Sequence, residues 1–220
     1  MEPKVNYEQC IMSFVFNTSY PSFEDELTPI LKAKNYKIEP PFKKPQIKHK
    51  EGPISIRVRN LKIAERNGCS VVFNPDIPVL FIGGNDWTKI YDEFNHLKEI
   101  LIEKMGFDLE EMIKSFELVS ENKIKTGERP RKMIDNFYQK CDVQAFSDIF
   151  NNEGSLFTIR FVPVKKEPNS DNWYEILIEP SGPLHYFERI VYRNKDVEKF
   201  LEMANNFDKK IVDVIKIIEG

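Results

Sequence analysis

Hydrophobic positions recur with two periods along the first half of the chain. A period of two predicts strands, and a spacing of three to four predicts helices. Residues 10–16 read as a strand, and the apolar residues from Phe23 to Leu31 predict a helix that contains Pro29. The first half then continues with three predicted strands and a long helix, at 54–59, 69–74, 77–83 and 87–105. Because the alternation changes parity after residue 59, we expect a bulge near Asn60.

The second half repeats this order of elements. A strand is expected at 114–120 and a helix from Pro130, while 143–150 fits either a short helix or a loop. Three strands and a final helix follow, at 155–164, 173–179, 185–193 and 195–218. The final helix has the most regular apolar stripe of the chain.

Each half therefore reads as strand, helix, three strands and long helix. This pattern predicts an α+β fold in which two pseudo-repeats, 1–108 and 109–220, form one continuous domain. The expected architecture is an antiparallel curved sheet with helices on one face. Helices 87–105 and 195–218 are expected on the same face of that sheet, because they occupy matching places in the two halves.

Composition narrows the classes of protein that fit this pattern. The 220 residues carry a formal net charge of -3, which disfavours a dedicated non-specific nucleic-acid binder. Cys10, Cys69 and Cys141 are scattered, which argues against a disulfide framework or a cysteine-rich zinc site. Neither a membrane-spanning apolar run nor the basic and apolar segments of a signal peptide are evident, so a cytoplasmic location is expected.

Two motifs were weighed as candidate chemistry. Gly83-Gly84 before Asp86 could hold a phosphate, but the motif lacks a full dinucleotide or P-loop signature, and a tight turn with a helix cap is the simpler interpretation. Asp92, Glu93 and His96 share one helical face, where a solvated ion pair is the simpler interpretation than a metal centre. The sequence therefore predicts no catalytic residues, metal or cofactor, while an enzyme of unrecognised type stays open.

The doubled order of elements resembles the saddle of the TATA-box-binding protein and its fold relatives. The segment Glu103-Lys-Met-Gly-Phe107 resembles the junction between the halves of that fold. The intercalating phenylalanine pairs of TATA-box binders have no counterpart here, and the fold by itself implies no DNA binding.

A second resemblance is textual. Gln9–Phe16, Phe116–Ile124 and the closing strand and helix are similar to an uncharacterised, sporadically distributed prokaryotic family. In place of a Tyr-Ile-Asn-like triplet, this chain has Ser120-Glu121-Asn122. That resemblance implies no activity.

The sheet face opposite the helices is the candidate interaction surface. It mixes arginine, aromatic and aliphatic side chains, as interfaces do. Six residues are the candidate binding residues: Arg57, Arg59, Arg160, Trp173, Glu175 and Leu177. Strand 77–83 is apolar on both parities, so a second layer is expected to cover it. Exposing this strand together with Trp173 and Leu177 would be unfavourable, so we expect a homodimer or a steady protein partner.

The sequence thus favours a non-catalytic binding or scaffold module that acts through an open sheet face. One alternative is a nucleic-acid-binding saddle that uses Arg57, Arg59, Arg160 and the basic loop 43–50. Another alternative is a small-molecule-binding protein or an enzyme of unrecognised type. The basic loop also fits a plain solvated loop.

Overall fold

The structure is a computed structural model that describes residues 2–20, 22–40, 48–49, 52–53, 60–138 and 156–220. Its strands are β1 Lys4–Phe16, β2 Lys37–Ile38, β3 Lys48–His49, β4 Gly52–Pro53, β5 Leu61–Arg66, β6 Cys69–Asn74, β7 Val79–Gly84, β8 Ile113–Lys125, β9 Ile159–Phe161, β10 Trp173–Gly182 and β11 His185–Asn194. Its helices are α1 Phe23–Ala33, α2 Trp87–Glu103, α3 Leu109–Met112, α4 Pro130–Tyr138, α6 Val197–Asn205 and α7 Phe207–Glu219.

Nine of the strands form one sheet, in the order β2-β5-β6-β7-β1-β8-β11-β10-β9, and β3 pairs with β4 separately. The predicted α+β class is therefore confirmed. The chain divides into two compact units, which we call unit 1 (Met1–Cys10 with Glu117–Gly220) and unit 2 (Ile11–Phe116). Both β1 and β8 contribute residues to both units. The compact units thus divide within strands, whereas the repeat predicted from the sequence divides at residue 108.

In unit 2, β5, β6 and β7 form an antiparallel meander. The β5–β6 hairpin turns on Asn67 and Gly68, whose φ angles of 53° and 82° are the left-handed pair that a two-residue hairpin of type I′ requires. The expected bulge occurs between Lys62 and Ala64, slightly beyond the predicted Asn60. The predicted strand 54–59 lies outside the described residues.

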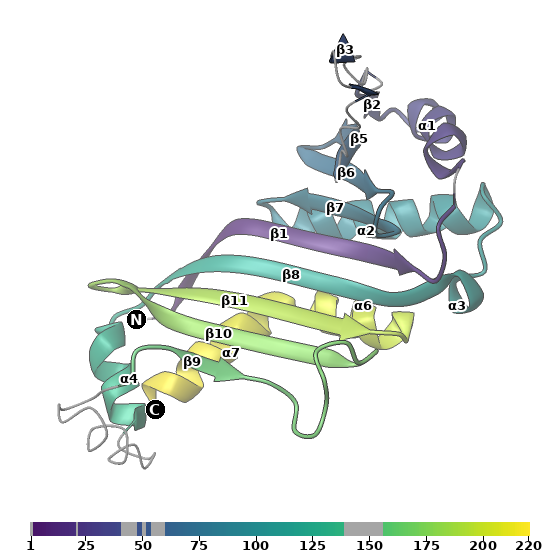
Figure 1. Cartoon of the computed structure of the whole chain (residues 1–220). Coiled ribbons are helices and arrows are strands. Elements are labelled where there is room, and N and C mark those ends of the chain that lie inside the picture. Colours follow the sequence, from purple (N-terminus) through teal and green to yellow (C-terminus); the bar gives the residue numbers. More distant parts are fainter. Residues whose placement is uncertain (1, 21, 41–47, 50–51, 54–59, 139–155) are drawn as a thin grey trace. The chain divides into compact units, whose positions relative to one another are not determined.

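Both long helices of unit 2 cover the same face of its strands. The Phe94 ring of α2 stacks on Phe14 of β1, with ring centroids 4.3 Å apart. From α1, the Phe23 ring contacts both Phe16 and Phe73, at 5.2 and 4.9 Å. The rings of β1 that alternate in the sequence therefore build the core of this unit, as the period of two predicts. Figure 1 shows α2 lying along β7.

The ends of α2 follow from local chemistry. Asp86 accepts a hydrogen bond from the Lys89 amide at 3.2 Å and caps the helix as expected, but Gly83 and Gly84 are the last two residues of β7 and do not form the expected turn. At the other end, Gly106 has a φ of 66° and the Phe107 amide donates to the Leu101 carbonyl at 2.9 Å. The positive φ of Gly106, just beyond the end of α2, suits a glycine, in agreement with the helix stop that the sequence predicts there.

In unit 1, β10 and β11 form a long hairpin, and β9 pairs with β10 only at residues 176–178. The predicted strand 155–164 is therefore much shorter, at Ile159–Phe161, because Pro163 and the polar turn after it end the pairing. The predicted turn at Pro180–Pro183 is tighter than expected, since Gly182 still pairs with His185.

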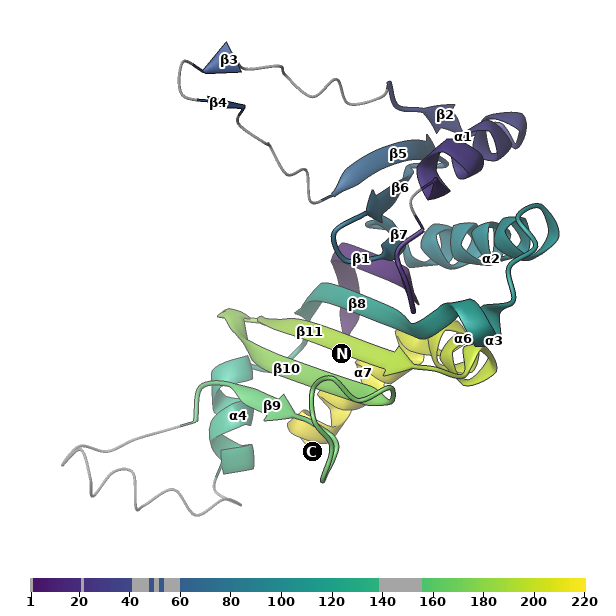
Figure 2. The same ribbon diagram turned by 45° about the vertical axis from the view of Figure 1, so that its right-hand side comes forward.

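The predicted final helix is two helices, α6 and α7, which meet at Asn206. The Asn206 side chain donates to the Glu202 carbonyl at 3.0 Å, and its backbone is not helical. The apolar stripe continues across the break, and six of its residues are buried: Phe200, Ala204, Phe207, Ile211, Ile215 and Ile218. Figures 1 and 2 both show α6 and α7 behind β11 and β10.

Candidate functional site

Four of the six candidate binding residues lie on one face of unit 1. Leu177 of β10 is paired with Arg160 of β9, and Glu175 and Trp173 follow Leu177 at every second position of β10. Directly paired residues and alternate residues project to the same side of a sheet. Arg57, Arg59, Cys141, residues 43–47 and the segment 143–150 lie outside the described residues.

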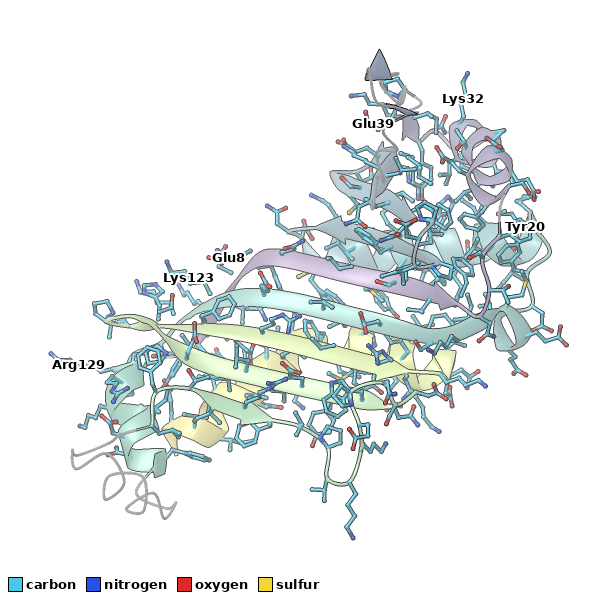
Figure 3. All side chains as sticks on the ribbon, viewed as in Figure 1. Glu8, Tyr20, Lys32, Glu39, Lys123 and Arg129 are labelled. Atoms are coloured by element: carbon cyan, nitrogen blue, oxygen red, sulfur yellow. The ribbon has the colours of Figure 1, made fainter. Side chains whose placement is uncertain are left out.

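This face points away from the helices of unit 1, and we call it the open face. Phe161, the neighbour of Arg160, projects the other way and meets the Phe137 ring of α4 at 6.3 Å. Tyr192 of β11 likewise stacks on Phe200 of α6, at 6.2 Å. In Figure 3 the open face of β8, β11 and β10 is turned toward the viewer and is covered with side chains, with Lys123 at one end of β8. The described helices α4 and α6 thus lie on the side opposite to the one that the alternation assigned to Arg160, Glu175 and Leu177.

A chain of ion pairs crosses the open face from strand to strand. Arg160 Nη2 lies 2.7 Å from Glu175 Oε2, and Arg189 Nη1 lies 3.6 Å from Glu175 Oε1. The same Arg189 guanidinium lies 3.6 Å from a carboxylate oxygen of Glu121 on β8. Charges of both signs therefore alternate over β9, β10, β11 and β8. We call these four residues the charge network.

A further pair lies near the other end of the hairpin. Arg193 forms an ion pair with Glu117 of β8 and also donates a hydrogen bond to the Pro168 carbonyl at 2.8 Å. Trp173, which is paired with Arg193 across the ladder, is only 6% exposed. The expectation that Trp173 contributes to an exposed apolar patch is therefore wrong, because its side chain is already buried within the chain.

The exposed fractions show which members of the charge network a partner can reach. The Arg160 side chain is 59% exposed, whereas Glu175 is 15% exposed. Ion pairs at such positions contribute little to folding, on the order of 0–1 kcal/mol each. Their arrangement matters more for which surfaces can approach the face than for the stability of the unit.

On the helix-covered side of the same strands, a chain of buried polar groups runs across unit 1. The Cys10 thiol lies 3.4 Å from the Ser120 hydroxyl, and Ser120 donates to the Asn122 side-chain oxygen at 2.6 Å. Asn122 Nδ2 in turn donates to Glu188 Oε2 at 3.1 Å. Glu188 is fully buried, and its Oε1 has no hydrogen-bond partner in the described part of the chain.

The surroundings of this row of buried polar groups shift the pKa of the two groups at its ends, Glu188 and Cys10. Burial raises the pKa of the Glu188 carboxyl to about 8, and the hydrogen bond from Asn122 only partly opposes that shift. Burial likewise raises the pKa of the Cys10 thiol to about 11, so Cys10 is a protonated, unreactive thiol at neutral pH. The row of buried groups from Cys10 to Glu188 therefore contains one acid with an unusual pKa, and its thiol is not activated.

Asp92, Glu93 and His96 of α2, the residues weighed as a metal site, do not have the surroundings that the sequence predicts. The sequence predicts a solvated ion pair here, but Glu93 is buried, and Arg66 Nη2 lies 2.9 Å from its Oε2. Tyr36 and Asn67 donate to the same carboxylate, each at 2.7 Å. Within the described ranges, His, Cys, Asp and Glu side chains form no group of three that could hold a metal ion.

A hollow of about 630 Å³ lies in unit 2 between α1 and the strands β2 and β5. Its charged lining residues are Glu24, Asp25, Glu39 and Lys62, and Lys62 pairs with Glu39 at 3.2 Å. None of these four carboxylate or ammonium groups is buried. The charged side chains that line the hollow are therefore in contact with solvent. Such groups are weaker support for catalysis than a buried acid or base.

The pattern of apolar and polar residues does not mark Glu188 or its partner Asn122 as a site. In the strand 185–193, both parities carry charged residues, so the alternation does not say which side is buried. One signal was available: Tyr186, Glu188, Ile190 and Tyr192 form the more apolar parity. A single carboxylate within an apolar parity marks a buried acid.

Comparison with protein-family models, with curated proteins and with solved structures gives no match for this chain. The resemblances to the TATA-box-binding protein fold and to the prokaryotic family thus stay predictions. Of the helices in the described part of the chain, none combines the length and the apolar character that crossing a bilayer requires.

Proposed function

We propose that this chain is a non-catalytic binding module that acts through the open face of unit 1, and that it associates with a second copy of itself. The observation that carries the proposal is the charge network, which runs over four strands on a face that the helices of unit 1 leave uncovered. Arginine is enriched in protein interfaces, and an exposed sheet face with charges of both signs can be complementary to the charges of a protein partner.

The signs of the charges favour a protein surface, and in particular a second copy. A face with alternating Arg and Glu side chains can meet its own copy across a two-fold axis so that each cation faces an anion. A nucleic acid would instead require a surplus of free cations. Within the proposed nucleic-acid set, Arg160 lies 2.7 Å from Glu175, so its charge is already balanced.

Leu177 gives the sharpest test, because it lies between Arg189 and Arg160 in one row of the sheet. A Leu177→Lys variant replaces the aliphatic side chain of this row with a third positive charge, which upsets the charge balance that lets the face meet its own copy. Sedimentation velocity over about 1–300 µM should give a dimer for the wild-type chain. We expect at least a tenfold weaker association for the variant.

Ile217→Lys is the matched control, because Ile217 is 68% exposed on α7 and lies on the helix side of unit 1. This control should associate as the wild-type chain does. A wild-type chain that stays monomeric at the highest concentration would reject self-association. Equal weakening by both variants would place the interface elsewhere than on the open face.

A further inference from the structure

Glu188 is a buried acid that plays no part in the open face. It lies on the helix-facing side of β11, between Tyr186 and Ile190, and all three side chains are buried. Tyr192, two residues after Ile190 on the same side of β11, stacks on Phe200 of α6. Glu188 therefore lies under the helix layer of unit 1, where water does not reach its carboxyl group.

The neighbouring elements supply one hydrogen bond to Glu188 and no opposite charge. Its only polar contact among the residues that the structure describes is the Asn122 amide of β8 at 3.1 Å, and its paired residue on β10 is Ile178. The second carboxylate oxygen is buried without a partner. A carboxylate anion normally accepts several hydrogen bonds or pairs with a cation when it is buried, so this setting suits the neutral acid.

The other titratable groups around the helix layer do not compensate a negative charge. Tyr186 has a raised pKa because of burial and the nearby carboxylates of Glu219 and Glu128. On α7, burial raises the pKa of Asp208, which accepts a hydrogen bond from Tyr7. The lysines of α7 are exposed, and Arg131 of α4 pairs with Asp135 at 3.5 Å.

We propose that Glu188 is a proton-sensitive switch for unit 1: the neutral acid permits close packing of α6 and α7 on β11, and ionisation loosens that packing. No other described group has to titrate for this effect. Because Glu188 faces the helices and not the open face, the switch operates whether or not the open face binds a partner.

The pH window follows from the two states of the carboxyl group. Its pKa is about 8 in the folded chain and 4.5 in an unfolded one. Between these values the folded state keeps the proton and the unfolded state has lost it, so stability falls as the pH rises from 4.5 to 8. Below 4.5 both states are protonated and above 8 both are ionised, so the contribution of Glu188 is constant there.

Hydrogen exchange of the α7 amides tests the switch in the whole chain. The variant Glu188→Gln keeps the shape of the side chain and removes the titration. After correction for the intrinsic pH dependence of exchange, we expect wild-type opening to increase up to about tenfold per pH unit between pH 5.5 and 7.5 relative to this variant. The same pH dependence in both proteins would overturn the proposal.

Two further measurements keep the test decisive. Asp213→Asn, at an exposed carboxylate of α7 itself that is outside the charge network, should keep the wild-type pH dependence. If Glu188→Gln does not fold, the carboxyl carbon of Glu188 can be titrated by NMR in the wild-type chain. A midpoint near 8 supports the switch, and a midpoint near 4.5 overturns it.

Discussion

Two buried glutamates, one in each unit, have opposite surroundings. Glu93 on α2 receives hydrogen bonds from Arg66, Tyr36 and Asn67, and the Arg66 guanidinium also lies over the Tyr36 ring at 4.3 Å. Glu188 on β11 receives one hydrogen bond from a neutral amide. Both residues are at most 2% exposed, so burial alone does not decide the charge of an acid. The partners decide it.

The difference predicts how each acid contributes to its unit. An anion that is paired and fully hydrogen-bonded stabilises the fold as long as its partners remain, and each partner is then costly to remove. A neutral buried acid depends on the pH instead. The chain offers a convenient probe of each unit, because one of its two tryptophans, Trp87, lies in unit 2 and the other, Trp173, lies in unit 1.

The largest effect is expected from Arg66→Met, which leaves Glu93 buried beside two neutral donors. We expect unit 2 to lose about 3 kcal/mol of unfolding free energy, because an unpaired buried charge remains. Urea unfolding, followed by the fluorescence of Trp87 in a Trp173→Phe background, measures the loss. Arg160→Met, which removes an arginine from an exposed pair, should cost less than about 1 kcal/mol. Equal losses for the two variants would contradict the role of burial.

Asn122→Ala should have the next largest effect, about 2 kcal/mol in unit 1, because it removes the one donor to Glu188 among the described residues. This donor lowers the pKa of Glu188, so its loss should raise that pKa further above 8. Urea unfolding followed by Trp173 fluorescence, in a Trp87→Phe background, gives the free energy. A double-mutant cycle with Glu188→Gln then isolates the coupling between the two residues. A coupling near zero would show that the bond has no energetic weight.

The period of the apolar residues predicted those helices and strands in which the buried residues repeat with a regular spacing. The helix α2 and the strands β6 and β7 were predicted within about two residues, because Phe73, Ile90 and Phe94 repeat with the period of their element. The break at Asn206 was not predicted. The apolar stripe runs through it without a glycine or proline, and only the bond from the Asn206 side chain to Glu202 shows where one helix ends.

The candidate site was predicted in part for the same reason. The alternation in β9 and β10 correctly separated Arg160 and Glu175 from Phe161, but it could not show that Trp173 is covered by its own chain. Nor could it identify the partners of the two buried acids. Arg66 and Glu93 are 27 positions apart, and Asn122 and Glu188 are 66 apart, so only the folded chain brings them together.

Tyr36→Phe removes one hydroxyl that donates to Glu93 at 2.7 Å. Because the acceptor is a buried anion, we expect a loss of about 1.5 kcal/mol in the unfolding free energy of unit 2. The ring of Tyr36 stays in place under Arg66, so packing changes little. Fluorescence of Trp87 during urea unfolding measures the loss, and no change would mean that Arg66 and Asn67 satisfy Glu93 without Tyr36.

The smallest effect is expected from the same substitution in the other unit. The Tyr186 hydroxyl is buried, and it has no hydrogen-bond partner in the part of the chain that the structure describes. Removing a buried polar group that makes no bond relieves its desolvation cost, so Tyr186→Phe should leave unit 1 unchanged or stabilise it by up to about 1 kcal/mol. The fluorescence of Trp173 during urea unfolding gives the value. A loss as large as that of Tyr36→Phe would mean that the Tyr186 hydroxyl is bonded in solution, for example to a buried water molecule, and that the contrast between the two buried acids is smaller than their protein partners indicate.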